Sequence, residues 1–279
     1  MSDYLQPLPS LDAAETIAAF DEATLWSTRA AANLFRFLEL NPSARGLDLG
    51  CGAGFPLLEL AQLHGPGSRF WGADLWAAAL RRAEAKRRTY GLDHVALARC
   101  DAGRLPFADA SFDVLVSNVG LNNFEAPEAA AAEAARVAKP GAILALTTNL
   151  RGHYREFYAA VRAVLNDLGA SADEIAAWDA QEAHRGTLES VARLLLPHGF
   201  DVVRNVQENQ TIRYVDGSAF LRAWLTRMGF LSGWREALPA GRDAEVLAAT
   251  EERLNAQAKR DGELRLTVPW LYLEARKRS

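Results

Sequence analysis

The segment that most constrains the fold is residues 46–54, with the sequence GLDLGCGAG. A short apolar run leads into glycines at 50, 52 and 54, and a helical pattern begins directly after them. Glycine allows sharp turns and a close approach of the backbone to a ligand, and a helix start offers backbone N–H groups. We therefore expect a strand, a nucleotide-type binding loop with clustered free N–H groups, and a helix.

Asp48 separates this loop from the common dinucleotide-binding loop. The dinucleotide loop has G-x-G-x-x-G spacing, whereas here the spacing is G-x-G-x-G and an acid stands two residues before the first glycine. A carboxylate at this point would repel a pyrophosphate and attract an ammonium or sulfonium group. The loop favours a cationic nucleoside, and a nicotinamide-dependent oxidoreductase is the weaker interpretation.

Short β-branched or apolar runs alternate with longer helical patterns from about residue 46 to residue 148. This alternation is typical of an α/β protein with a parallel sheet and crossover helices. Two further extended runs follow later in the chain. The predicted strands are 46–50, 69–74, 94–99, 112–118, 142–148, 200–214 and 263–275.

Helical patterns fill most of the remaining chain. One insertion, 217–260, begins with a stretch that places Phe220, Leu221, Trp224, Leu225 and Met228 on one face of a single helix. Thr187 is the expected cap of another helix. Two helices are predicted over 12–40, one more that begins near Gly54 and another that spans 76–90. Further helices are predicted over 128–138, 153–168 and 187–197.

Two more acids follow predicted strands. Asp74 ends the second strand, 24 residues after Gly50 (74 − 50 = 24), near the spacing at which a carboxylate accepts both ribose hydroxyls. Asp101 follows the third strand, where a carboxylate can accept a hydrogen bond from an adenine amino group. Ligands of such sheets bind at the carboxyl ends of the strands. Each acid alone could equally cap a helix or face water, but the three acids together indicate a site.

These features together resemble the class I S-adenosylmethionine-dependent methyltransferases, of the broad group that includes the ubiquinone and menaquinone C-methyltransferases. The resemblance covers about residues 46–148. Its motifs are LDLGCGAG at 47–54, Asp74, DA at 101–102 with LPF at 105–107, SFDV at 111–114 and ARVAKPG at 135–141.

The resemblance implies a Rossmann-like fold with a seven-stranded, mostly parallel sheet, an antiparallel last strand and a helical cap. It also implies S-adenosyl-L-methionine as cofactor, with Asp48 and the glycines at the methionine moiety, Asp74 at the ribose and Asp101 with Ala102 at the adenine. Asn118 would line the methyl-donor side. The residues expected at the cofactor are Asp48, Gly50, Cys51, Gly52, Gly54, Asp74, Leu75, Asp101, Ala102 and Asn118.

Length and composition limit the alternatives. A chain of 279 residues fits one elaborated domain. We expect N-terminal helices at 1–40, a cofactor-binding core at 41–150, the rest of the sheet at 151–215 and 263–279, and a cap insertion at 216–262. A net charge of −4 supplies no steering toward nucleic acid. Two cysteines and no long apolar run predict neither a zinc site nor a membrane span. A cytoplasmic, metal-free enzyme with a small-molecule acceptor is the expectation.

The residues that select the methyl acceptor are the hardest to identify from the sequence. His153 follows the fifth predicted strand and is the candidate general base, although a histidine that merely caps the next helix is the commoner case. Tyr154 and Tyr158 lie one helical turn apart and either line the pocket or pack as ordinary apolar positions. Trp224 is the third candidate for contact with the acceptor.

An apolar or aromatic acceptor is expected if part of the aromatic stripe faces the methyl donor. Trp26, Trp224, Met228, Phe230 and Trp234 would then cover it, although burial of the stripe against the core explains most of this pattern. Arginines 213, 222 and 227 could meet an acidic group on the acceptor, and His184-Arg185 is a weaker candidate.

Two other functions remain possible interpretations of the sequence beside methylation of a small molecule. A non-catalytic protein could keep the same nucleoside pocket as a sensor, because the three acids indicate binding and not turnover. A macromolecular acceptor is disfavoured by the acidic balance, and the basic cluster of the helix at 76–90 (Arg81, Arg82, Lys86, Arg87 and Arg88) is more simply a solvated helix face.

Overall fold

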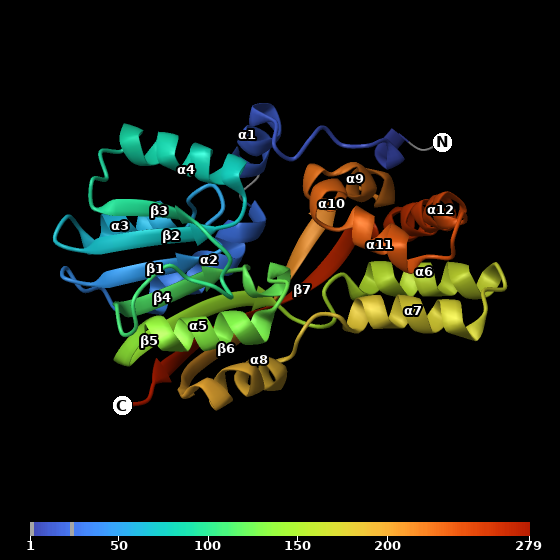
Figure 1. Ribbon diagram of the computed structural model, residues 1–279. Helices are drawn as coiled ribbons and strands as arrows, with labels where there is room; N and C mark the ends of the chain where they lie inside the picture. The colour runs from blue at the N-terminus through green and yellow to red at the C-terminus, as the bar shows by residue number, and fades with distance from the viewer. Residues whose placement is uncertain (1–2, 23–24) are drawn as a thin grey trace. The chain divides into compact units, whose positions relative to one another are not determined.

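A computed structural model describes residues 3–22 and 25–279 (Figure 1). The strands form one seven-stranded sheet in the order β3-β2-β1-β4-β5-β7-β6. The strands from β1 to β5 pair in parallel, and β5 pairs antiparallel with β7. The predicted strands and the antiparallel last strand are confirmed. The strands are β1 Arg45–Leu49, β2 Arg69–Asp74, β3 Val95–Arg99, β4 Phe112–Asn118, β5 Ala138–Asn149, β6 Phe200–Tyr214 and β7 Leu264–Lys277.

The helices occupy the connections, and most follow the predicted ranges. Those before β5 are α1 Ala14–Glu22, α2 Leu25–Phe37, α3 Leu57–His64, α4 Ala77–Thr89 and α5 Pro127–Val137. Those after it are α6 Arg155–Asp167, α7 Ala172–Ala183, α8 Leu188–Leu195, α9 Gly217–Arg222, α10 Trp224–Gly229, α11 Leu231–Ala237 and α12 Asp243–Asp261.

The structure differs from the sequence prediction in two helical regions. The single helix expected to begin the 217–260 insertion is interrupted at Ala223, whose φ of −58° and ψ of 134° are extended, so Phe220 and Trp224 lie on separate helices. The helix α7 had no predicted counterpart, although Ser171 and Glu174 form a capping box at its start. The predicted Thr187 cap of α8 is confirmed, because its side chain accepts a hydrogen bond from the backbone of Ser190.

The chain divides into two compact units. The sheet unit comprises residues 10–149, 187–207 and 270–279, and the helical unit comprises the chain up to Pro9 with residues 150–186 and 208–269. The long strands β6 and β7 contribute to both. The prediction of one elaborated domain stays a prediction.

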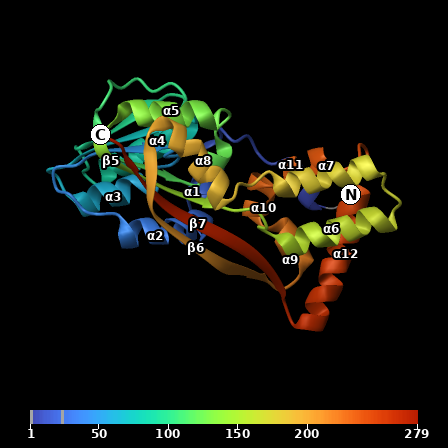
Figure 2. The ribbon, with the colours of Figure 1, turned by 90° about the horizontal axis from the view of Figure 1, so that it is seen from below.

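The sheet unit is packed on both faces. In Figure 2, α2 and α3 lie on one side of the sheet and α5 and α8 on the other. The core on the first side joins Leu34 of α2, Leu57 and Leu58 of α3, and Phe70 of β2, all with at most 1% of their surface exposed. This packing holds the carboxyl ends of β1, β2 and β4 at one edge of the sheet, since these strands run in parallel.

The helical unit has an aromatic core. Phe157 of α6 lies 4.2 Å from Trp234 of α11 between ring centroids, and Trp178 of α7 packs against Tyr158 at 5.0 Å. The indole N–H of Trp178 donates to the backbone carbonyl of Tyr158, so the rings are fixed by polar as well as apolar contacts. Aromatic pairs with such geometry stabilise a core beyond simple burial.

Candidate cofactor and acceptor site

The glycine loop after β1 is tied to the end of β2. The backbone N–H groups of Gly50 and Cys51 both donate to the carbonyl of Ala73, at 2.8 and 3.2 Å, and that of Gly54 donates to Cys51 at 2.8 Å. The N–H of Gly52 donates to Asp74 Oδ2 at 2.7 Å. The prediction of clustered free N–H groups is therefore wrong at these four positions, since each N–H makes a hydrogen bond within the chain.

The glycines are required by backbone conformation and by space. Gly50, Gly52 and Gly54 have φ values of +77°, +50° and +99°, in the region that residues with a Cβ rarely adopt. A Cβ on Gly54 would lie 2.9 Å from the Leu58 side chain, and one on Gly50 would lie 3.3 Å from Phe124. The loop is thus close-packed on its protein side.

Asp48 lies at the centre of this arrangement. It is fully buried, and neither of its carboxylate oxygens makes a hydrogen bond within the described residues. Burial, followed by the nearby Asp74 carboxylate, raises the pKa of Asp48 to about 8, although the backbone at Leu57 favours the ionised form. A buried carboxyl group without a partner is costly, and a cationic group would relieve that cost.

The other two acids stand at neighbouring strand ends. Asp74 also accepts from the backbone N–H of Trp76 at 2.8 Å, and the N–H of Cys100 donates to the Asp74 carbonyl at 3.1 Å. Asp101 is exposed and accepts from the N–H of Gly103. Leu75, beside Asp74, is 58% exposed, while Ala102 is buried. The hydrogen bond between residues 74 and 100 brings the two acidic ends together.

Asn118 is held by hydrogen bonds at both ends of its amide. Its Nδ2 donates to the carbonyl of Ser27 on α2 at 3.1 Å, and its Oδ1 accepts from Thr147 Oγ1 at 2.6 Å. The side chain therefore fastens α2 to the ends of β4 and β5.

Aromatic neighbours of the loop escaped the sequence prediction. The ring of Phe20 on α1 would lie 3.9 Å from a Cβ on Gly52, and Phe124 lies beside Gly50. Phe20 also packs against Trp76 at 5.3 Å. The sequence signal was only an apolar residue in an amphipathic helix, and its position at the loop depends on how α1 packs.

The donor set fits S-adenosylmethionine better than a dinucleotide. The N–H groups of Gly50, Cys51, Gly52 and Gly54 are already engaged and do not serve a pyrophosphate, which Asp48 would also repel. The same unpaired acid suits an ammonium or sulfonium group, and Asp74 at the end of β2 suits a ribose.

The comparisons with known proteins agree with this geometry. Residues 47–146 match the family described as a methyltransferase domain. The strand order, the glycine loop and this match decide the assignment. Residues 47–146 form an S-adenosylmethionine-dependent methyltransferase domain of the class I fold.

Individual relatives of this methyltransferase match it to different extents. A nocamycin O-methyltransferase of Saccharothrix syringae is 28% identical over 264 residues, which cover 89% of this chain and 90% of the relative. A ubiquinone/menaquinone biosynthesis C-methyltransferase of Burkholderia mallei is 35% identical over 102 residues, 37% of this chain and 42% of the relative. A methyltransferase structure from Aquifex aeolicus shares the fold with a TM-score of 0.54 and 21% identity, covering 70% of this chain and 92% of its own.

The expected acceptor residues lie in the helical unit. His153 is 1% exposed, and its ring centroid lies 5.4 Å from Tyr154, 5.5 Å from Tyr158 and 5.7 Å from Phe230. Neither of its ring nitrogens has a hydrogen-bond partner among residues 3–22 and 25–279. Burial, and then Arg185 nearby, lowers the pKa of His153 to about 3, so its imidazole is neutral at pH 7.

The two tyrosines and Trp224 differ in their surroundings. Tyr154 and Tyr158 are almost fully buried, and the Tyr158 hydroxyl accepts from the indole N–H of Trp234 at 3.0 Å. Trp224 is partly exposed. The expected aromatic cover is divided between the units, since Trp26 belongs to the sheet unit and packs against Trp270.

The arginines expected to meet an acidic acceptor already have partners in the helical unit. Arg213 pairs with Glu263, and Arg227 donates to the backbone carbonyls of residues 4 and 6. Arg222 pairs with Asp3 and Glu251.

The basic cluster of α4 is largely neutralised within the sheet unit. Arg82 and Lys86 pair with Asp21 of α1, at 2.8 and 2.6 Å. Arg87 and Arg88 pair with Glu84 of α4 itself. This pairing agrees with an ordinary helix face.

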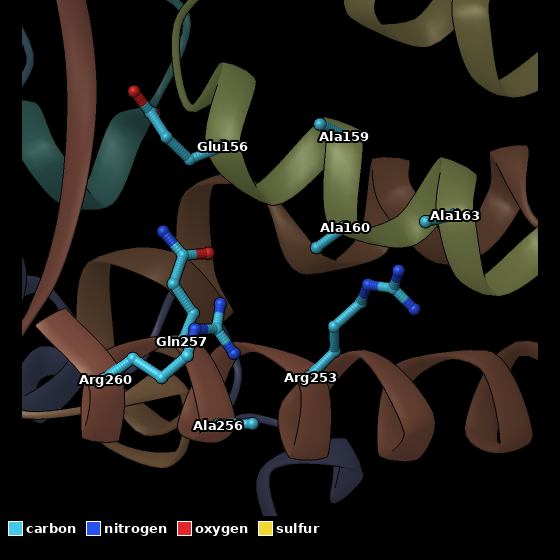
Figure 3. Close-up of a pocket in the computed structure, with 8 residues that line it drawn as sticks. All are labelled: Glu156, Ala159, Ala160, Ala163, Arg253, Ala256, Gln257 and Arg260. Carbon is cyan, nitrogen blue, oxygen red and sulfur yellow. The ribbon is translucent and has the colours of Figure 1, made fainter.

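A separate open groove of about 460 Å³ lies between α6 and α12 (Figure 3). Small side chains form much of its wall, and Arg253 and Gln257 extend from α12 toward α6. None of the residues expected at the cofactor or the acceptor lines it. Its lining is Glu156, Ala159, Ala160, Ala163, Arg253, Ala256, Gln257 and Arg260.

Within residues 3–22 and 25–279, no group of three or more His, Cys, Asp or Glu side chains is arranged to hold a metal ion. Over the same ranges, no helix combines the length and the apolar character needed to cross a membrane.

Proposed function

We propose that this methyltransferase acts on a small, largely apolar or aromatic organic molecule. The aromatic surroundings of His153 support an apolar acceptor. The similarity to a nocamycin O-methyltransferase extends over nearly the whole of both chains, whereas the quinone C-methyltransferase match is confined to the core. The longer match favours oxygen as the methylated atom.

The buried, unpaired Asp48 is the observation that carries the cofactor placement. Its carboxylate and the three glycines would hold the methionine moiety of S-adenosyl-L-methionine, Asp74 the ribose, and Asp101 with Ala102 the adenine. Leu75, with its exposed side chain, would pack against the adenine, and Asn118 would line the methyl-donor side.

Bound S-adenosylmethionine supplies a methyl group already activated on a sulfonium. The chain's task is therefore to hold the acceptor atom in line, about 3 Å from the methyl carbon. His153, neutral at pH 7, would accept a hydrogen bond from an acceptor hydroxyl. Because the His153 imidazolium is disfavoured, the hydroxyl proton passes on to solvent and does not stay on the imidazole, so this arrangement suits a hydroxyl that is itself acidic. Tyr154, Tyr158 and Trp224 would contact the rest of the acceptor.

The test is activity of the pure protein with methyl-labelled S-adenosylmethionine against a panel of small phenols, enols and carboxylic acids, together with calorimetry of S-adenosylhomocysteine binding. We expect S-adenosylhomocysteine to bind and the labelled methyl group to be transferred to an oxygen atom of the acceptor. Binding without transfer to any compound would favour the non-catalytic sensor. Thermal stabilisation by NAD(P) and not by S-adenosylhomocysteine would overturn the proposal. A cytoplasmic location stays a prediction from the sequence.

A further inference from the structure

Asn149 and Trp270 form a pair at the carboxyl end of β5. The two residues are directly opposite each other in the antiparallel pairing of β5 with β7, and such partners point their side chains to the same face, with Cβ atoms about 5 Å apart. Because β1, β4 and β5 run in parallel, the pair lies at the same edge of the sheet as Asp48 and Asn118.

Both side chains are buried, and each carries an N–H group without a partner. Asn149 is 2% exposed and Trp270 is 3% exposed. Asn149 Nδ2 and Trp270 Nε1 make no hydrogen bond with any described residue. A buried donor without a partner costs about 1–3 kcal/mol, so two of them side by side are unusual in a well-packed sheet.

Asn122 fixes which end of the Asn149 amide is free. The Nδ2 of Asn122 lies 2.8 Å from Asn149 Oδ1 and 3.3 Å from the backbone carbonyl of Asn149. A backbone carbonyl can only accept a hydrogen bond, so the Asn122 atom is a donor and the Asn149 atom that faces it is the oxygen. The free atom of Asn149 is therefore its NH₂ group.

The indole of Trp270 is held by α2. Trp26 packs edge-on against it, with 4.6 Å between ring centroids. Two residues further along β7, Tyr272 stacks on Phe37 at the other end of α2. Since α2 thus runs along this face of the strand, the Trp270 ring cannot rotate freely to find another partner.

We propose that Asn149 and Trp270 form a two-donor site that binds an unprotonated oxygen of the methyl acceptor. The inference rests on the proposed function, because it assigns the pair to that reaction's acceptor. The pair offers two donors, and the only acceptor atom of the Asn149 amide is already occupied by Asn122. A carboxylate, enolate or carbonyl oxygen satisfies both donors, whereas a hydroxyl that must also donate does not. Sites of this kind discriminate strongly because the wrong ligand leaves buried groups unpaired.

The pair can be tested with two naphthalene probes that differ in the group at the oxygen. ¹⁵N-labelled protein saturated with S-adenosylhomocysteine is titrated with 2-naphthoate and with 2-naphthylmethanol. The chain has seven tryptophans, and their indole N–H signals are assigned by triple-resonance spectra. We expect 2-naphthoate to shift the Trp270 signal and to bind at least tenfold more tightly than the alcohol.

Variants separate the donors from the packing. Trp270→Phe removes the N–H and keeps a ring, and Asn149→Leu removes the NH₂ group at similar size. Each variant should weaken 2-naphthoate about tenfold and leave binding of 2-naphthylmethanol within twofold. Trp71→Phe is the matched control, since Trp71 of β2 packs against Phe107 and against Phe112 of β4, and it should behave as wild type.

Several results would overturn the two-donor site. These are equal affinity for both probes, no binding of either probe, an unmoved Trp270 signal, or unchanged 2-naphthoate affinity in Trp270→Phe. Failure of the proposed function would be seen separately, because the wild type would then not bind S-adenosylhomocysteine in calorimetry. If a variant does not fold, the wild-type titration alone decides through the Trp270 signal.

Discussion

The carboxylate of Asp74 accepts a hydrogen bond from the backbone N–H of Gly52, with 2.7 Å between Oδ2 and N. Its other oxygen accepts from the N–H of Trp76, which precedes α4. The acid proposed to hold the ribose therefore also holds the glycine loop and the start of the next helix. Cofactor binding and loop geometry depend on one side chain.

Replacement of Asp74 by alanine should weaken cofactor binding and also destabilise the glycine loop. We expect S-adenosylhomocysteine affinity to fall by about 1–3 kcal/mol, the scale of hydrogen bonds to a charged group, and the melting temperature to fall because the N–H groups of Gly52 and Trp76 lose their acceptor. Calorimetry and thermal unfolding measure the two effects. Asp93→Ala is the control, since the Asp93 side chain is fully exposed. Unchanged affinity in Asp74→Ala would mean that the ribose lies elsewhere.

Asp48→Asn should weaken cofactor binding and raise the stability of the protein. With a folded pKa of about 8 against 3.8 when unfolded, the folded state holds a proton that the unfolded state has lost between these pH values. The wild type therefore loses stability as pH rises from about 4 to 8. The asparagine variant lacks this loss and should gain most in melting temperature, relative to wild type, near pH 8.

The same acid predicts proton release on ligand binding. If the methionine ammonium group pairs with Asp48, the carboxyl group must ionise, so calorimetry at pH 7 in buffers of different ionisation enthalpy should detect nearly one proton released per S-adenosylhomocysteine. Asp48→Asn should bind more weakly and release none. Proton release that persists in the variant would assign the titration to another group.

Local patterns predicted most of the fold. The strands could be read from alternating apolar runs, and the Thr187 cap from its spacing to the helix. The antiparallel last strand came from the family resemblance, because no local signal tells which strands pair.

The parts that could not be predicted depend on contacts between distant segments. The loop N–H groups are engaged because the carbonyl of Ala73 on another strand lies within reach of Gly50 and Cys51. Asn149 and Trp270 are partners only through the register of β7 on β5. The break at Ala223 is a single residue in an otherwise continuous helical pattern, so sequence periodicity could not show it.

Asp21 fastens α1 to α4, and its loss should loosen the cover beside the loop. Its side chain is 9% exposed and pairs with Arg82 and Lys86. Asp21→Asn leaves two cations with a neutral partner, so we expect a loss of about 1–3 kcal/mol in unfolding free energy. Denaturant unfolding measures the loss, with Asp12→Asn as the exposed control. A loss no larger than that of the control would mean that apolar contacts alone hold α1, namely Ile17 against Ala78 and Ala79 and Phe20 against Trp76.

His153 should contribute to turnover and to acid sensitivity in distinguishable ways. Its folded pKa of about 3 lies below the unfolded value of 6.5, so between these values only the unfolded state binds the proton, and stability falls as pH drops below about 6.5. His153→Phe should lack this part of the acid sensitivity in thermal unfolding.

The kinetic test of His153 uses the alanine variant. His153→Ala should lower kcat while leaving S-adenosylhomocysteine affinity unchanged, because the residue is proposed to contact the acceptor and not the cofactor. The wild-type pH–rate profile should show no ionisation near 6.5 from this group, since its neutral form persists down to about pH 3. Turnover at the wild-type level in His153→Ala would remove His153 from the reaction and leave it as a buried histidine of the aromatic core.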